Sequence, residues 1–207
     1  YNNPGTADYT MTVNAVGTGG VVSTISKKIT VFVAFEIPAE IVQNLTGGSS
    51  KIWMSDKDEL GHFGVGPNNE FSPIWYAATP NSRDVCSYDD EVTFSKDANN
   101  NIFMSINNKG QSFSIGASTA FYGFGGGDAC LGVLTTGSKK LAFMDSTSSS
   151  TPAVSTRIQF DVPGNGLIIF GTGGTTYEIL SITATTIHLR NIGIDGNSWY
   201  QKLKVKS

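Results

Sequence analysis

The fold is decided by Tyr177-Glu178-Ile179-Leu180-Ser181-Ile182, which is followed by Thr186-Ile187-His188-Leu189-Arg190 and then by Ser198-Trp199-Tyr200-Gln201-Lys202-Leu203. In each segment β-branched and aromatic residues alternate with polar ones, which is the period of a strand that buries one face. Short polar turns separate the segments, so the stretch predicts three consecutive antiparallel strands. The side chains expected in the core are those of Ile179, Ile182, Ile187, Leu189, Trp199 and Leu203.

The same alternation recurs along most of the chain. Residues 91–95, 102–106 and 156–162 have it, and Gly, Asn or Asp interrupts it about every 8–12 residues. Residues 38–45 suggest one or two helical turns, with Pro38 in the first turn. The predicted fold class is therefore all-β, an antiparallel jelly-roll-like β-sandwich. The serine-rich segment 145–152 is expected to be a mobile loop between two strands.

Charge and composition exclude several classes of function. The 207 residues carry 14 Lys and Arg against 17 Asp and Glu, a net charge of −3, and the densest basic cluster is Lys202, Lys204 and Lys206. Nucleic acid is therefore not an expected partner, because phosphate binding needs a concentrated positive surface. No apolar run approaches the roughly 20 residues of a membrane-spanning helix. Any export signal or membrane anchor is expected outside these residues.

The first 35 residues predict a unit separate from the rest. They contain two strands, 7–16 and 23–35, joined by the turn Gly17-Thr18-Gly19-Gly20. An isolated hairpin is marginally stable in water. These strands are therefore expected to need other strands as partners.

The hairpin resembles the end of a known module. Pro4-Gly5-Thr6-Ala7-Asp8-Tyr9-Thr10-Met11-Thr12-Val13, followed by Lys28-Ile29-Thr30-Val31, is similar to the last two strands of a PKD or similar immunoglobulin-like domain. The front half of such a domain is missing, so we expect a C-terminal fragment of a longer protein. The expected division is residues 1–35 for the end of this module, 36–50 for a linker and 51–207 for the β-sandwich.

Candidate ligand-contacting residues gather between Trp53 and Asn81. Glycine-rich and proline-rich turns hold aromatic residues in this segment, which suits stacking against the C–H faces of a sugar ring. Core packing is the alternative for any single aromatic residue. Adjacent residues of an extended chain point to opposite faces, so one member of a pair can face solvent. The residues predicted to contact carbohydrate are Trp75 and Tyr76 at the centre, with Trp53, His62, Asp56, Asn68, Phe121 and Tyr122 around them.

Patterns of catalytic or metal-binding residues are weak. Asp89-Asp90-Glu91 could ligate Ca²⁺ or form a glycosidase pair, but an acidic turn before a strand is the simpler interpretation. The Glu-x-Asp-x-x-Glu spacing of a jelly-roll β-glucanase is absent. Cys86 and Cys130 are consistent either with one disulfide or with two buried thiols. The sequence therefore predicts no enzyme and no cofactor, and it leaves a structural calcium ion unassigned.

Several segments between residues 36 and 207 carry a family resemblance. They are Leu45-Thr46-Gly47-Gly48-Ser49-Ser50-Lys51-Ile52-Trp53, Gly61-His62-Phe63-Gly64-Val65-Gly66-Pro67, Trp75-Tyr76-Ala77-Ala78, Tyr88-Asp89-Asp90-Glu91-Val92-Thr93-Phe94, Tyr177-Glu178-Ile179-Leu180-Ser181-Ile182 and Trp199-Tyr200. Together they are similar to the C-terminal domains of cell-surface glycan-binding lipoproteins of Bacteroidetes polysaccharide-utilisation systems. In that family PKD-like domains precede a distal β-sandwich that binds glycans, often β-glucans such as laminarin, without cleaving them.

The resemblance implies a ligand, a location and partners. The ligand would be a polysaccharide or oligosaccharide, bound at the extracellular face of the bacterial outer membrane. The protein would be held there by a lipid anchor outside this chain, beside outer-membrane glycan importers. Two other functions stay open. A jelly-roll β-glucan hydrolase would need a carboxylate pair on one concave face, and a structural or adhesive surface domain would bury Trp75 and Tyr76 completely.

Overall fold

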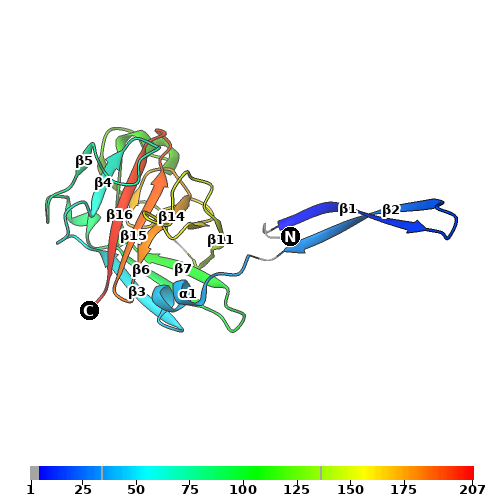
Figure 1. Cartoon of the computed structure of the whole chain (residues 1–207). Coiled ribbons are helices and arrows are strands. Elements are labelled where there is room, and N and C mark those ends of the chain that lie inside the picture. Colours follow the sequence, from blue (N-terminus) through cyan, green and yellow to red (C-terminus); the bar gives the residue numbers. More distant parts are fainter. Residues whose placement is uncertain (1–4, 34, 136) are drawn as a thin grey trace. The chain divides into compact units, whose positions relative to one another are not determined.

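Antiparallel strands dominate the regular secondary structure of the described residues, and the all-β class predicted from the sequence is confirmed. The computed structural model describes residues 5–33, 35–135 and 137–207. The chain forms two compact units, residues 1–36 and 37–207 (Figure 1). Each unit has sheets of its own.

The first unit is a hairpin of two long strands, β1 (Gly5–Val16) and β2 (Val22–Val33). The strands are antiparallel, and Asp8 lies opposite Thr30. The Thr30 hydroxyl donates to Asp8 Oδ1 at 2.7 Å across the ribbon. The two predicted strands are confirmed, and their resemblance to the end of a PKD-like module stays a prediction.

The second unit is a large antiparallel sheet that curls into a nearly closed, barrel-like sandwich. Its strands are β3 (Ser50–Ser55), β4 (Phe63–Gly66), β5 (Tyr76–Ala77), β6 (Glu91–Lys96), β7 (Ile102–Asn107), β10 (Lys139–Lys140), β11 (Ala142–Asp145), β12 (Ile158–Asp161), β14 (Thr176–Ile182), β15 (Thr186–Ile192) and β16 (Ser198–Val205). The order in the sheet is β10-β7-β6-β3-β16-β15-β14-β12-β11, and β4 joins β16 to β5.

A single residue brings the two ends of this sheet together. β10 and β11 lie at opposite ends of the strand order, but only Leu141 separates them in the chain. The Leu141 N–H also donates to the Ile102 carbonyl of β7 at 2.9 Å. The strand at one edge of the sheet therefore runs directly into the strand at the other edge, which closes the sheet on itself.

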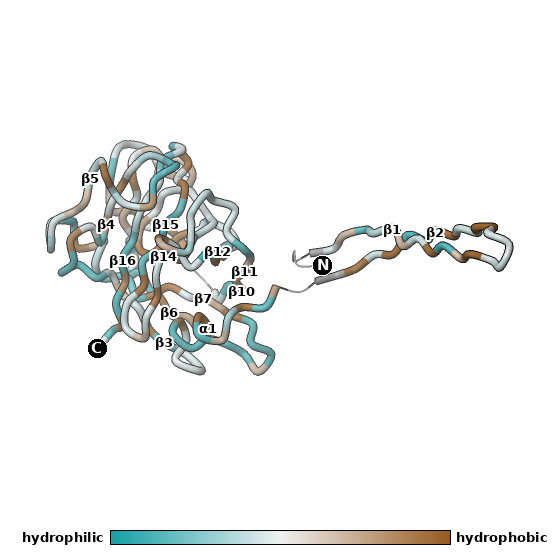
Figure 2. The backbone as a smooth tube through the Cα atoms, in the orientation of Figure 1, coloured by the Kyte–Doolittle hydropathy of each residue, from teal (hydrophilic) through white to brown (hydrophobic). Residues whose placement is uncertain are grey.

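Aromatic side chains from opposite walls of the sheet meet in the core. The ring centroids of Phe94 in β6 and Phe160 in β12 lie 6.2 Å apart, although four strands separate β6 from β12 in the sheet. Phe160 stacks in turn on Tyr177 of β14 at 5.9 Å. Figure 2 shows hydrophobic positions recurring along β6 and β7 among hydrophilic ones. The core side chains predicted in β14, β15 and β16 are confirmed as buried, except for Ile182, which is half-buried.

A small three-stranded sheet packs against β4. Its central strand is β8 (Ser112–Ser114), which pairs with β9 (Ala129–Leu131) and, in parallel, with β13 (Phe170–Gly171). Phe63 of β4 lies 4.0 Å from the Phe170 ring and 5.6 Å from the Phe113 ring, measured between centroids. This aromatic contact joins the two sheets.

A disulfide crosses the same region. Cys86, in the 3₁₀ turn η1 (Val85–Ser87), is bonded to Cys130 of β9, and their Cα atoms are 6.0 Å apart. Of the two alternatives open from the sequence, the structure has the disulfide rather than two thiols. The bond ties the turn before β6 to the small sheet.

The predicted helical turns are confirmed as α1 (Ala39–Thr46), which begins after Pro38. Ile41 and Leu45 of α1 are buried, and the Leu45 carbonyl accepts a hydrogen bond from Trp53 Nε1 at 2.9 Å. Residues 37–50 therefore belong to the second unit, which corrects the prediction of a linker over 36–50. Within the described parts of the chain, no helix is long and apolar enough to cross a membrane.

Candidate functional site

Exposed apolar side chains lie at the end of the loop between β4 and β5. Trp75 is 59% exposed, Ile74 59% and Tyr76 42%. Val65 of β4 lies opposite Tyr76, and the Trp75 N–H donates to the Val65 carbonyl at 3.1 Å. Strand pairing thus continues up to the aromatic pair and fixes its backbone. We call Ile74, Trp75 and Tyr76 the aromatic surface.

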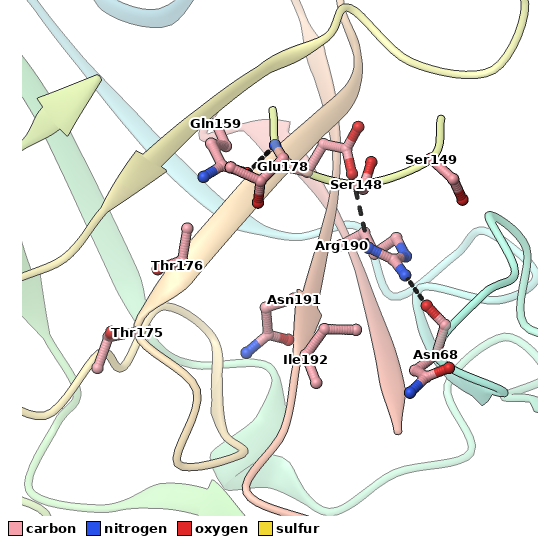
Figure 3. Close-up of a pocket in the computed structure, with 11 residues that line it drawn as sticks. Asn68, Ser148, Ser149, Gln159, Thr175, Thr176, Glu178, Arg190, Asn191 and Ile192 are labelled. Atoms are coloured by element: carbon pink, nitrogen blue, oxygen red, sulfur yellow. Dashed lines mark hydrogen bonds and ion pairs between the residues drawn. The ribbon is translucent and has the colours of Figure 1, made fainter. Parts of the chain in front are cut away.

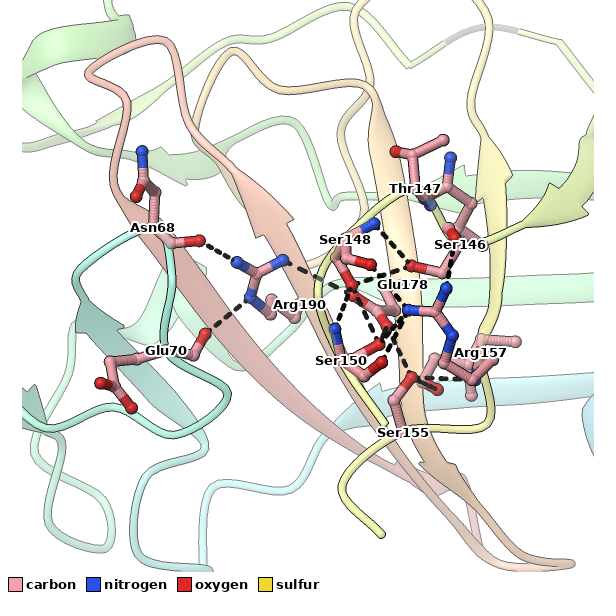
Figure 4. Close-up of polar contacts among 12 residues, drawn as sticks. Asn68, Glu70, Ser146, Thr147, Ser148, Ser150, Ser155, Arg157, Glu178 and Arg190 are labelled. Carbon is pink, nitrogen blue, oxygen red and sulfur yellow. Dashed lines mark hydrogen bonds and ion pairs between the residues drawn. The ribbon is translucent and has the colours of Figure 1, made fainter. Parts of the chain in front are cut away.

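Arg190 of β15 anchors the loop that leads to this surface. Its Nε donates to the Glu70 carbonyl at 2.9 Å, and its Nη2 donates to the Asn68 carbonyl (Figure 4). The Tyr200 hydroxyl donates to the same Glu70 carbonyl at 2.7 Å. The guanidinium carbon lies 4.7 Å from the centroid of the Phe71 ring, a cation–π distance. The loop is therefore held in place before any ligand arrives, which reduces the ordering cost of binding.

The close return of this loop over β4 requires glycine at position 64. Gly64 lies opposite Ala77, and a β-carbon there would overlap Pro73 and come within 3.1 Å of the Tyr76 carbonyl oxygen. Pro73 also has a fixed φ, which limits the paths open to the loop. The glycine and proline residues of this segment therefore position the aromatic surface, in agreement with the turns predicted from the sequence.

Trp53 was predicted to lie near the ligand, and the structure corrects this. Its side chain is fully buried, and its Nε1 is bonded to the carbonyl of Leu45 in α1. β3, which carries Trp53, is a central strand of the sheet, between β16 and β6. Because Trp53 lies in a central strand and its side chain faces the core of the domain, it cannot contact a ligand on the surface.

His62 and Asp56 are also buried, contrary to their predicted contact with ligand hydroxyls. His62 is 2% exposed and bonds through both ring nitrogens, to the Glu59 carbonyl at 2.7 Å and to the Tyr88 hydroxyl at 3.0 Å. Burial lowers the pKa of His62, so its ring is neutral near pH 7. Asp56 is 8% exposed and lies 3.4 Å from Lys204 Nζ. Their polar atoms are therefore occupied by internal partners.

The other predicted residues lie at the surface or at its edge. Phe121 is 43% exposed on the 3₁₀ turn η3 (Ala120–Tyr122). Tyr122 is half-buried, and its hydroxyl accepts a hydrogen bond from the Gly173 N–H at 3.2 Å. Asn68 is exposed in the β4–β5 loop, where its backbone is bonded to Arg190. Asn68 also lines a pocket that the sequence did not predict.

This pocket lies over β14 and β15 and has a volume of about 420 Å³ (Figure 3). Glu178 and Arg190 stand opposite each other in the two strands and form an ion pair at 3.5 Å. Hydroxyl and amide side chains surround them, including those of Gln159 and Asn191. We call this cavity the polar pocket.

The serine-rich segment between β11 and β12 forms one rim of the polar pocket. Arg157 holds it, with Nη1 donating to the carbonyls of Ser148 and Ser150 at 2.8 and 2.9 Å. The hydroxyls of Ser150 and Ser155 donate to Glu178 Oε1 (Figure 4). The segment is therefore a loop, as predicted, and hydrogen bonds with Arg157 and Glu178 anchor it.

The sequence contains a signal for this site that does not take the form of a motif. Glu178 lies between the core residues Tyr177 and Ile179, and Arg190 follows the core residue Leu189. Strand alternation places both charges on the outer face of predicted neighbouring strands. Pairing these strands in register would bring opposite charges together across the hairpin. The two loops that cover the pair come from distant segments and have no such local signal.

Groups suited to acid–base or metal chemistry are few. Burial raises the pKa of Asp90 to about 8, but its side chain is fully buried and accepts a hydrogen bond from the Ser112 hydroxyl at 2.8 Å. Across residues 5–33, 35–135 and 137–207, no group of three or more His, Cys, Asp or Glu side chains is arranged to hold a metal ion. Among the described residues, the aromatic surface and the polar pocket are two features suited to binding.

No protein-family model matches the sequence, and no curated protein matches it. The geometry of the aromatic surface and the polar pocket, together with the resemblance seen in the sequence, supports the inferences about binding.

Proposed function

We propose that the second unit is a non-catalytic carbohydrate-binding domain that binds a neutral β-glucan of the laminarin type. The observation that carries the proposal is the 59% exposure of Trp75 on an anchored loop, beside Ile74 and Tyr76. Sugar rings present apolar C–H faces, and a large aromatic ring with few torsions is a suitable partner for them. A purely structural role would favour burial of this pair.

The low charge of the protein supports a neutral ligand. Charged residues make up 15% of the chain, and the net charge is −3. The resemblance of the sequence to surface glycan-binding lipoproteins agrees with this choice. On that basis we place the protein at the outer face of a bacterial outer membrane, attached through a segment outside these residues and acting beside glycan importers.

The state of the carboxyl groups argues against glycoside hydrolysis. A glycosidase needs a protonated carboxyl group and a second carboxylate flanking the bond to be cleaved. Asp90 has a raised pKa but is buried behind Ser112. At Glu178, burial raises the pKa, but the hydroxyls of four serines, led by Ser150 and Ser155, together offset this and bring the pKa below its ordinary value. An ionised Glu178 is a poor general acid.

Affinity electrophoresis and calorimetry of the full chain with β-1,3-glucan, mixed-linkage glucan and α-glucan test the proposal. We expect retardation and heat of binding with a β-glucan, and no new reducing ends during incubation. Absence of binding to every glucan would favour a structural or adhesive domain. Reducing ends that accumulate, and that a carboxylate substitution abolishes, would identify a hydrolase instead.

A further inference from the structure

The polar pocket contains two buried acceptor oxygens that the protein leaves without a hydrogen-bond donor. Glu178 is 4% exposed and Asn191 is 2% exposed, and both line the pocket. Among the described residues, no donor is hydrogen-bonded to Glu178 Oε2 or to Asn191 Oδ1. Glu178 Oε2 has only its ion-pair contact with Arg190 Nη1, at 3.5 Å. A buried acceptor without a donor is costly, so each of these oxygens favours a ligand that can donate.

The charges in the pocket cancel. Glu178 and Arg190 are its charged lining residues, and the remaining lining side chains are hydroxyls, amides and Ile192. The carboxylate is ionised, because serine hydroxyls lower the pKa of Glu178 by more than burial raises it. An anionic ligand would face this carboxylate, and a cationic ligand would face the Arg190 guanidinium. A neutral donor, such as a hydroxyl group, meets neither penalty.

The other walls suit the remaining parts of a sugar ring. Gln159 Oε1 accepts a hydrogen bond from the Thr147 N–H at 3.2 Å, which leaves the Gln159 amide group to donate to a ligand oxygen. Ile192 is 39% exposed at the pocket and offers an apolar contact for C–H groups. The volume of about 420 Å³ lies in the range of small-molecule sites.

We propose that the polar pocket binds one neutral, hydroxyl-rich ring of monosaccharide size, whose hydroxyls donate to Glu178 Oε2 and Asn191 Oδ1. This is a second site, with chemistry different from that of the aromatic surface. It does not depend on the binding of a glucan there. The two sites are linked through Arg190, which pairs with Glu178 in the pocket and anchors the loop of the aromatic surface.

Amide NMR spectra of the full chain, titrated with glucose, galactose, mannose and xylose, test this proposal. We expect at least one neutral sugar to shift the signals of residues 147–149 and 190–192 in a saturable manner. The uronic acid and the amino sugar of the same ring should bind about tenfold more weakly or worse, because each brings a charge next to one member of the ion pair.

Two variants locate the binding. Asn191→Ala removes one acceptor and should weaken binding about tenfold. Ser149→Trp fills the pocket from an exposed position on its rim and should abolish binding without removing a buried contact. Thr185→Trp, at the exposed turn of the same hairpin, is the matched control and should bind normally. Thermal unfolding of each variant shows whether it is folded.

Three results would overturn the proposal. They are the absence of saturable shifts with every sugar, shifts that persist in folded Ser149→Trp, and tighter binding of the uronic acid than of the neutral sugar. None of these results depends on whether glucans bind at the aromatic surface, because that binding is measured with polysaccharides. The failure of either proposal is therefore distinguishable from the failure of the other.

Discussion

Glu178 and Arg190 face each other directly across the β14–β15 pair, with Glu178 Oε2 3.5 Å from Arg190 Nη1. Both side chains are almost completely buried, so both charges are removed from bulk water. The serine-rich loop donates hydrogen bonds to the Glu178 carboxylate. The Arg190 guanidinium donates a hydrogen bond to the carbonyl of Glu70 in the β4–β5 loop. One ion pair therefore organises both rims of the polar pocket and the loop that carries the aromatic surface.

Removal of one partner of this pair is expected to destabilise the second unit strongly. Glu178→Ala would leave Arg190 buried without its counter-ion, which typically costs about 3–5 kcal/mol. Urea unfolding followed by tryptophan fluorescence measures this cost. Glu59→Ala, at an exposed position, should change the free energy of unfolding by no more than about 0.5 kcal/mol. Similar small effects of the two substitutions would contradict the structural role of the pair.

Asp90 is expected to make the protein less stable as the pH rises. Burial raises its pKa to about 8; the hydrogen bond from Ser112 opposes this rise and the charge of Asp89 adds to it. Between the unfolded pKa of 3.8 and about pH 8, the folded state holds a proton that the unfolded state releases. The free energy of unfolding therefore falls across this window.

Asp90→Asn tests this dependence, because an amide has the shape of the protonated carboxyl group. Its urea midpoint should vary less with pH than that of the wild-type protein between mildly acidic and mildly alkaline conditions. Asp84→Asn, at an exposed position, should keep the wild-type slope. An unchanged slope in Asp90→Asn would show that Asp90 is ionised in the folded state.

The Cys86–Cys130 disulfide is expected to stabilise the second unit. It closes a loop with a sequence separation of 44, and the chain-entropy model gives about 4 kcal/mol for a loop of this size. Replacement of both cysteines by serine should lower the thermal midpoint clearly. A reducing agent should lower the midpoint of the wild-type protein and leave that of the double variant unchanged. If the wild-type thermal midpoint is unchanged after the disulfide has been fully reduced, this stabilising role is contradicted.

Trp75 is expected to dominate binding at the aromatic surface. Trp75→Ala should cost about 2 kcal/mol of binding free energy, roughly a thirtyfold weaker complex with a β-glucan. Folding should be retained, because the side chain is 59% exposed. Leu134→Ala, at another exposed apolar position, is the control for loss of surface area and should bind normally. Calorimetry gives both affinities, and equal affinity of the two variants would move the site elsewhere.

Local patterns in the sequence were sufficient to predict the longer strands of the fold, whereas short strands such as β10 and β13 were not predicted. Alternation and turn residues predicted the hairpin of the first unit, the turns of α1 and the core side chains of β14, β15 and β16. They also identified the loop that exposes Trp75. These features depend on residues a few positions apart, so a short segment contains the information that determines them.

Contacts between distant segments decided the rest. Closure of the sheet through Leu141 depends on the meeting of β10 with β7 and of β11 with β12. Trp53 and His62 lie in the same aromatic, glycine-rich segment as Trp75, yet packing against other parts of the chain buries them. The polar pocket exists because two loops fold over one ion pair. The sequence by itself determined which segments become the longer strands and the turns between them. Only tertiary packing decided which side chains are buried and which polar atoms lack a partner, because burial and hydrogen bonding depend on neighbours brought together from distant parts of the chain.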